Sequence, residues 1–310
     1  MKTVHKLFII FVMSIFAKRK TLLQNMAFMA IMAAINIIIS VIAAFSPIAS
    51  VILVIFLPLT STLVELFCED KYYPIYAIAT FGLGVVATLW NIQSTFFTLL
   101  PSLITGYIFG LFAKHKFNPI WSVLAASALQ ALITLLFIPL INFIFGVDII
   151  YTFKAAFKLT ESENIGIIIP AFILAISIVQ IVLSYIVVSQ EVKKFDQSME
   201  YEKCNYMLFG IIGSVLSLSL IGFYYLSLAV AYIFLILSIY FASFIVVYFI
   251  KDKMWRTLIL CGAFVLLTIF IFALAYSSVK PNSALLLIGV APFCISTLSL
   301  VVSFLKKKPD

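Results

Sequence analysis

Side chains able to carry acid–base chemistry are scarce in the apolar stretches of this sequence. One carboxylate lies within such a stretch: Glu65, in the run Leu63-Val64-Glu65-Leu66-Phe67, shortly before Glu69-Asp70-Lys71. An ionisable group in an apolar helix either reaches the membrane interface or serves a proton or cation relay, and both interpretations of Glu65 stay open. Because no second acid lies inside an apolar stretch, a pair of carboxylates for catalysis is not available.

Enzyme motifs are equally scarce. The chain has two histidines, His5 and His115, and four cysteines without ligand-like spacing, so neither a metal site nor a His-containing triad is indicated. There is no glycine-rich phosphate loop or nucleotide-binding motif. We therefore expect no enzyme activity, no catalytic residue, no metal and no cofactor, and any energy from ATP would come from a partner protein.

Amide and aromatic side chains are the better candidates for a binding site. A buried amide must form hydrogen bonds or it costs a few kcal/mol, so each either bridges helices or contacts a solute. Most of these residues fall at one end of the predicted bundle, and one lies deeper. The candidate solute-binding residues are Asn36, Trp90, Asn91, Gln93, Asn142 and Tyr151.

The composition indicates the class of protein that must position these residues. Of 310 residues, 65% are hydrophobic and 10% are charged, and the mean hydropathy is +1.23. Soluble domains contain about 25% charged residues. The sequence therefore predicts an all-α, polytopic transmembrane helix bundle whose main partner is the lipid bilayer.

Stretches of about 20 apolar residues can cross the hydrocarbon core, and ten are present. The longest is expected to tilt or break at Pro139. The predicted spans are 22–45, 48–67, 73–90, 95–113, 119–146, 166–189, 206–226, 228–250, 257–277 and 284–304.

The basic residues predict the orientation. If the N-terminus is cytoplasmic, all but three of the 20 Lys and Arg residues fall in cytoplasmic segments, and the exceptions are Lys154, Lys158 and Lys280. An excess of Lys and Arg in short loops marks the cytoplasmic side. We expect both termini in the cytoplasm. The same distribution argues against nucleic acid as the partner of a chain with a net charge of +8.

Three further segments organise the chain. Residues 1–20 are expected to form a cytoplasmic interfacial segment, because the apolar run after Lys6 is too short to span. Residues 190–205 form a charged linker between a six-span unit, 21–189, and a four-span unit with a short basic tail, 206–310. The external segment 147–165 has an apolar face at helical spacing and is either an amphipathic interfacial helix or a lid.

Small residues at helical spacing predict flat helix surfaces. Ala30 and Ala34 are four residues apart, and so are Gly106 and Gly110. Such small-xxx-small motifs let another helix approach closely. They also occur by chance in apolar helices, so alone they indicate packing.

Residues 18–189 together resemble the S components, the solute-binding membrane subunits of energy-coupling factor (ECF) transporters. The likeness lies in the basic run Lys18-Arg19-Lys20, the Ala30-x-x-x-Ala34 motif, six spans, a polar turn at Asn91–Ser94 and the helix end Gly106–Lys114. With four additional spans, the length and arrangement of the whole chain resemble those of the YybS-like family, bacterial membrane proteins distantly related to S components, which implies a location in a bacterial plasma membrane. The resemblance implies that Ala30 and Ala34 dock on an ECF coupling membrane subunit, which works with ATPases. It also implies that Trp90, Asn91, Gln93 and Tyr151 lie near a small-molecule solute.

Three functions compete at this point. The chain is a solute-binding subunit of an ECF-type micronutrient uptake system, a non-transporting membrane scaffold or regulator on the same fold, or a self-sufficient carrier or flippase. The near absence of charge within the spans weighs against ion coupling, and hence against the third.

Overall fold

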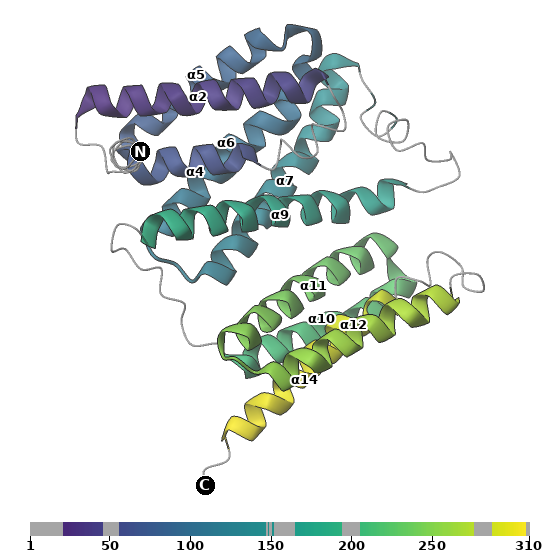
Figure 1. Cartoon of the computed structure of the whole chain (residues 1–310). Helices are drawn as coiled ribbons and strands as arrows, with labels where there is room; N and C mark the ends of the chain where they lie inside the picture. Colours follow the sequence, from purple (N-terminus) through teal and green to yellow (C-terminus); the bar gives the residue numbers. More distant parts are fainter. Residues whose placement is uncertain are drawn as a thin grey trace, which may run out of the picture. The chain divides into compact units, whose positions relative to one another are not determined.

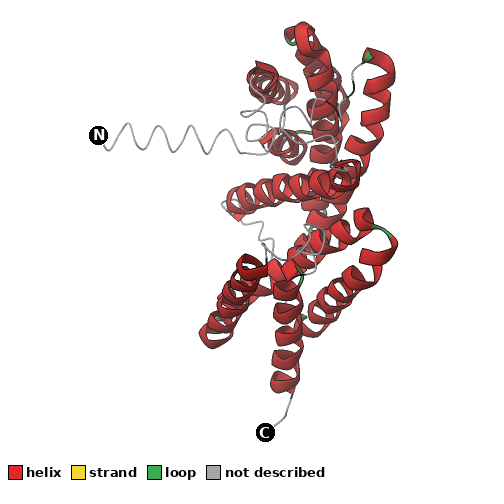
Figure 2. Ribbon diagram, turned by 90° about the vertical axis from the view of Figure 1, so that its right-hand side faces the viewer, coloured by secondary structure: helices red, strands yellow, loops and turns green. Residues whose placement is uncertain are grey.

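The computed structural model describes residues 21–45, 56–146, 148, 151, 165–193, 205–275 and 287–307, and these residues form helices joined by short loops (Figures 1 and 2). The longer helices are α2 (Leu22–Phe45), α4 (Leu57–Phe67), α5 (Tyr73–Ala87), α6 (Ile92–Lys114), α7 (Pro119–Phe145), α9 (Ile165–Lys193), α10 (Tyr206–Leu226), α11 (Leu228–Lys251), α12 (Trp255–Ala275) and α14 (Val290–Lys307). Two 3-10 turns, η2 (Asp70–Tyr72) and η3 (Leu89–Asn91), flank α5. The predicted all-helical class is confirmed for the described residues.

Seven of these helices are long and apolar enough to cross a membrane: α2, η3 with α6, α7, α9, α10, α11 and α12. The other three predicted spans coincide with α4, α5 and α14, which are shorter in the described residues. The number of spans and their orientation therefore stay predictions. Helix α7 continues through Pro139, so the expected break there does not occur.

Several helix ends follow from local sequence. The side chain of Asn118 accepts a hydrogen bond from Ile120 N (3.1 Å) in front of Pro119, and Gly146, with φ of +63°, ends α7 in the left-handed conformation. Asn205 accepts from Leu208 N (3.1 Å) at the start of α10. Side-chain caps and a terminal glycine satisfy the backbone groups that a helix end leaves unpaired.

The outward surface of the bundle is apolar. Phe143 is 88% exposed and Leu23 79% exposed, and most outward-facing positions of the long helices carry Ile, Leu, Val or Phe. Large apolar surfaces are unfavourable in water and suit a lipid environment. A membrane-embedded helical bundle is the class that these surfaces fit.

The chain divides into two compact units. The first comprises α2, α4, α5, α6, α7 and the part of α9 from Ile173, and the second comprises the start of α9 with α10, α11, α12 and α14. The predicted division at 190–205 stays a prediction, since 194–204 lie outside the described residues. Residues 1–20 and all of 147–164 except 148 and 151 also lie outside them, so the structure does not test the interfacial segment or the lid.

In the first unit, α4 and α6 approach closely through the two glycines of the GxxxG motif. A Cβ placed on Gly106 would overlap Ser61 Cβ, and one on Gly110 would lie 2.6 Å from Glu65 Cβ. Any side chain at Gly106 or Gly110 would therefore require α4 and α6 to move apart. The GxxxG motif packs these two helices of the same unit against each other.

In the second unit, α10 packs against α11 and α14. Tyr206 stacks on Phe249 with ring centroids 5.3 Å apart, and the Ser299 hydroxyl donates to Tyr206 O (2.8 Å). Gly213 faces Ser296, which leaves no room for a Cβ. Small residues thus bring α10 and α14 together, as in other helix pairs of membrane proteins.

Candidate functional site

Helix α5 has a polar buried face and an apolar exposed face. Its buried residues are Tyr73, Tyr76, Thr80 and Gly84, whereas Ile78 on the other side is 74% exposed. This is the reverse of a water-soluble amphipathic helix. The polar side chains of α5 therefore face the interior of the first unit, where they meet polar groups of α2, α4 and α6.

Asn36 is at the centre of this polar interior. Its Nδ2 donates to the Tyr76 hydroxyl (3.0 Å), and its Oδ1 accepts from the Thr60 hydroxyl. Asn36 is fully buried. The side chain thus links three helices, α2, α4 and α5, which is the helix-bridging use of a buried amide, and contact of Asn36 with a solute stays a prediction.

Two further hydroxyls lie around Tyr76. Ser61 and Thr80 are fully buried and face the Tyr76 hydroxyl, but their oxygens do not meet hydrogen-bond geometry with any described group. The Tyr73 hydroxyl donates to Leu103 O (2.6 Å) on α6. The four helices are therefore held together by neutral side-chain hydrogen bonds, which carry no charge into the apolar interior.

Glu65 forms the charged end of this interior. Its carboxylate Oε1 accepts from Lys114 Nζ (2.8 Å) at the end of α6, and Lys114 also pairs with Asp70 in η2. Lys114 Nζ lies 3.5 Å from Cys68 O as well. The Glu65 side chain is fully buried, and its Oε2 has no hydrogen bond within the described residues. One ammonium group thus joins the ends of α4 and α6 and the turn after α4.

Ion pairs shift the pKa values of two charged groups that lie outside the predicted spans. The hydrogen bond from Lys114 holds the pKa of Asp70 below its ordinary value of 3.8. Next to it, the hydrogen bond to Glu69 (2.6 Å) raises the pKa of Lys71. Because the side chains of Lys71 and Glu69 are both exposed, this second pair contributes little to stability.

The structure tests the two sequence interpretations of Glu65 in part. The carboxylate is buried and paired with Lys114, so it does not reach out to the interface by itself. A buried ion pair needs both partners, since removal of one leaves an uncompensated charge. The contacts therefore define Glu65 as part of a helix-joining cluster, and a relay function stays a hypothesis.

The residues predicted near the solute are only partly brought together. Trp90 is 57% exposed, and its ring packs against Phe45 with centroids 4.9 Å apart. Asn91 Nδ2 donates to Ala44 O (3.2 Å). Trp90 and Asn91 thus both contact the end of α2, where they fasten the α5–α6 connection to that helix.

Gln93 lies in the first turn of α6, not in a loop as the polar turn Asn91–Ser94 implied. Asn142 is half-buried. Its backbone oxygen accepts a hydrogen bond from Gly146 N (3.0 Å). Between α6 and α7, Phe96 contacts Phe145 with ring centroids 5.7 Å apart, so Gln93 and Asn142 lie at the same end of these helices.

Tyr151 is exposed, and its described contact is local. Its backbone nitrogen donates to Asp148 Oδ1 (3.0 Å). The structure therefore does not bring Tyr151 to the other candidates through described residues.

Ala30 and Ala34 both lie on the exposed face of α2, while Met29, Met32 and Ala33 on the other face are buried. The helix is packed on one side by α4 and α5 and presents the two alanines on the other. Within the described residues, this gives a narrow low-profile strip on the surface of the first unit.

Sequence reasoning missed the partners rather than the residues. Lys114 lies between the predicted spans, where it counts toward the cytoplasmic Lys and Arg residues, and the sequence does not single out Asp70, Thr60 or Tyr76. The spacing Gly106, Gly110, Lys114 contained a usable signal, because residues four apart lie on one helix face, and that face is the one against α4. No comparable signal pairs Asn36 with Tyr76, 40 residues away.

Comparison of the chain with protein-family models, with curated proteins and with solved structures finds no match.

Proposed function

We propose that the protein is an integral membrane solute-binding subunit of an ECF-type uptake system, energised by ATPases that are separate partner proteins. The observation that carries this proposal is the position of Ala30 and Ala34 on the exposed face of α2. In the S components that the sequence resembles, an alanine motif of this kind docks on the coupling membrane subunit. Small side chains at both positions allow such an approach.

The interior of the first unit supports this proposal indirectly. Asn36, Thr60 and Tyr76 join α2, α4 and α5, and Lys114 joins the ends of α4 and α6. These contacts hold α2 in a fixed position relative to α4 and α5, so that its exposed face is available to a partner protein. Trp90, Asn91, Gln93 and Asn142, at the opposite end from Lys114 along α6, are the residues that we propose to lie nearest the solute.

A second candidate is a membrane scaffold or regulator that docks through the same face without transporting a solute. The specific observation in its favour is that the amides of Asn36 and Asn91 already bridge helices. Amides that are used in this way contribute to the stability of a bundle and are less available to a solute.

Affinity purification from native membranes, followed by mass spectrometry, tests both candidates. The solute-binding function predicts recovery of a coupling-type membrane subunit together with two ATPases, and loss of all three in Ala30→Trp and Ala34→Trp. Leu136→Trp is the matched control, since Leu136 is an exposed residue on α7 and its replacement leaves α2 unchanged. If the two alanine variants retain the same partners as the wild type, the docking surface is wrongly assigned. Recovery of an envelope or signalling protein without ATPases favours the scaffold.

A further inference from the structure

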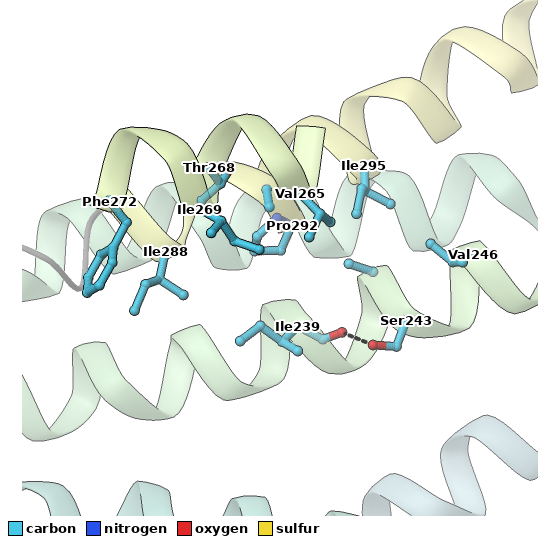
Figure 3. A pocket seen from close by; sticks show the side chains of 12 residues that line it. Ile239, Ser243, Val246, Val265, Thr268, Ile269, Phe272, Ile288, Pro292 and Ile295 are labelled. Carbon is cyan, nitrogen blue, oxygen red and sulfur yellow. Dashed lines mark hydrogen bonds between the residues drawn. The ribbon is translucent and has the colours of Figure 1, made fainter. Parts of the chain in front are cut away.

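The second unit contains an apolar groove between α11, α12 and α14 (Figure 3). Its volume is about 500 Å³, within the range of roughly 300–1,000 Å³ that is typical of ligand pockets. Ile239 and Val246 line it from α11, Val265 and Phe272 from α12, and Pro292 and Ile295 from α14. All of these side chains are hydrocarbon, so the groove favours an aliphatic ligand.

The groove has two hydroxyl groups, and both are bonded to their own helices. Ser243 donates to Ile239 O (2.8 Å), as the dashed line in Figure 3 shows, and Thr268 donates to Phe264 O (2.8 Å). Among the described residues, those that line the groove carry no charge. A polar ligand would lose its hydrogen bonds to water here without gaining replacements, which excludes sugars, nucleotides and free amino acids as good occupants.

The two helices that form the walls of the groove are joined by a basic turn. Helix α11 ends at Lys251 and α12 begins at Trp255, and the side chains of Lys251, Lys253 and Arg256 are all exposed. The one acid in this turn, Asp252, accepts a hydrogen bond from the Tyr206 hydroxyl (2.7 Å). The turn therefore carries net positive charge. It also contains Trp255, and tryptophan is enriched at membrane interfaces.

The distance between the basic turn and the groove matches the dimensions of a lipid. At a rise of 1.5 Å per residue, Val246 and Ile239 lie roughly 7 and 18 Å from Lys251 along α11. One leaflet of the hydrocarbon core is about 15 Å thick. A lipid whose headgroup lies at Lys251 can therefore place a fatty acyl chain alongside these groove residues, down to the middle of the bilayer.

We propose that this groove holds one acyl chain of an anionic phospholipid, whose phosphate is bound by Lys251, Lys253 and Arg256. The acyl chain fills the space between the apolar side chains of α11, α12 and α14. The basic turn selects a negatively charged headgroup over a zwitterionic one. The site belongs wholly to the second unit and is independent of the uptake function proposed for the first.

The test uses the full-length protein, purified in mild detergent and supplemented with either phosphatidylglycerol or phosphatidylcholine. Native mass spectrometry measures the lipid retained, and a thermal unfolding assay measures the change in Tm. We expect about one tightly retained phosphatidylglycerol per protein and a higher Tm, with neither effect from phosphatidylcholine. Each basic residue near a membrane surface contributes about 1 kcal/mol of attraction, so Lys253→Gln should weaken retention about fivefold.

Matched variants separate the groove and the turn from general effects. Ser243→Phe fills the groove and should lower retention, whereas Val215→Phe adds the same ring at an exposed position of α10 and should not. Lys116→Gln is the control for Lys253→Gln, because both lysines have positive φ in exposed turns between helices.

Three results would overturn the proposal. The first is equal retention of phosphatidylglycerol and phosphatidylcholine by the wild type. The second is equal retention of phosphatidylglycerol by Ser243→Phe and Val215→Phe. The third is that Ser243→Phe loses a dimer and not the lipid, which would assign the groove to a second copy of the chain. Should Ser243→Phe fail to fold, the combined variant Lys251→Gln, Lys253→Gln, Arg256→Gln decides the matter, since retention equal to the wild type also overturns the proposal.

Discussion

Gly110 on α6 lies directly against the side chain of Glu65 on α4: a Cβ placed on the glycine would be 2.6 Å from both Cβ and Cγ of the glutamate. The absence of a side chain at Gly110 thus allows the aliphatic part of Glu65 to pass beside α6. Its carboxylate then reaches Lys114, one helical turn further along α6.

The close approach predicts that Gly110→Ala destabilises the protein. Overpacking of a tight contact costs about 1–3 kcal/mol, and here the added methyl group would also displace a buried carboxylate. Gly82→Ala is the control, because nothing lies within 4 Å of a Cβ at Gly82, and alanine in a helix is favoured over glycine by roughly 0.5–1 kcal/mol. Thermal unfolding in detergent should give a lower Tm for Gly110→Ala and an unchanged or higher Tm for Gly82→Ala. Equal shifts would contradict the close packing of α4 against α6.

The ion pair of Glu65 predicts strong coupling between two substitutions. Lys114→Met leaves a fully buried carboxylate without its cation, which should destabilise the protein by about 3–5 kcal/mol. The double variant Glu65→Met, Lys114→Met removes both charges and should recover most of that loss. Free energies of unfolding for the two single variants and the double variant form a double-mutant cycle. Additive losses would mean that the two side chains do not form a pair in the folded protein.

The lowered pKa of Asp70 predicts a stability contribution that depends on pH. A carboxyl group whose pKa is lower in the folded state stabilises the fold above its unfolded pKa, and this contribution disappears as the pH falls through the folded value. The wild type should therefore be more stable than Asp70→Asn at pH 6. The difference should shrink as the pH falls below the ordinary value of 3.8. Because Asp70 is more than half exposed, we expect a small effect. Tm measured from pH 6 to pH 3 checks it, and a difference that grows on acidification would mean that the pKa of Asp70 is raised in the folded protein instead of lowered.

The bridging role of Asn36 predicts a loss of stability from Asn36→Leu. The substitution removes the amide that donates to the Tyr76 hydroxyl, and a buried polar group left unsatisfied costs about 1–3 kcal/mol. The Thr60 hydroxyl keeps its hydrogen bond to Leu57 O (2.9 Å), so the loss falls mainly on Tyr76. Gln93→Leu, at a half-buried position in the first turn of α6, should cost less. Combining Asn36→Leu with Tyr76→Phe should cost less than the sum of the two. If Asn36→Leu instead keeps full stability and abolishes solute uptake, Asn36 contacts the solute.

The sequence predicts most helix bounds because apolar length and local stop signals determine them. The prediction 22–45 coincides with α2, and 206–226 coincides with α10, which begins after the cap Asn205. The prediction was wrong between 90 and 95, where Trp90 and Asn91 form a 3-10 turn and Gln93 already lies in α6. A polar, uncharged run can form either a loop or a first helical turn, and only contacts such as that of Asn91 with Ala44 decide between them.

The site was less predictable, since it depends on which helix faces meet. Glu65 was identified from its chemistry, but Lys114 lies 49 residues later in the chain and its charge had a sufficient explanation as an orientation signal. Asn36 was identified as a buried amide, yet its partners Thr60 and Tyr76 are ordinary residues of other helices. The apolar groove has no signature in the sequence, because Ile239, Val265 and Ile295 belong to three helices and each looks like any other lipid-facing residue.

The distance along the sequence between Glu65 and Lys114 affects the order in which the chain can be built into a membrane. Helix α4 carries Thr60, Ser61, Thr62 and Glu65. A helix with these polar side chains and an unpaired carboxylate enters lipid unfavourably. The ammonium group that pairs with Glu65 is synthesised 49 residues later. A ribosome-bound chain that stops before Lys114 should therefore remain associated with the translocon, and release into lipid should follow once α6 is complete.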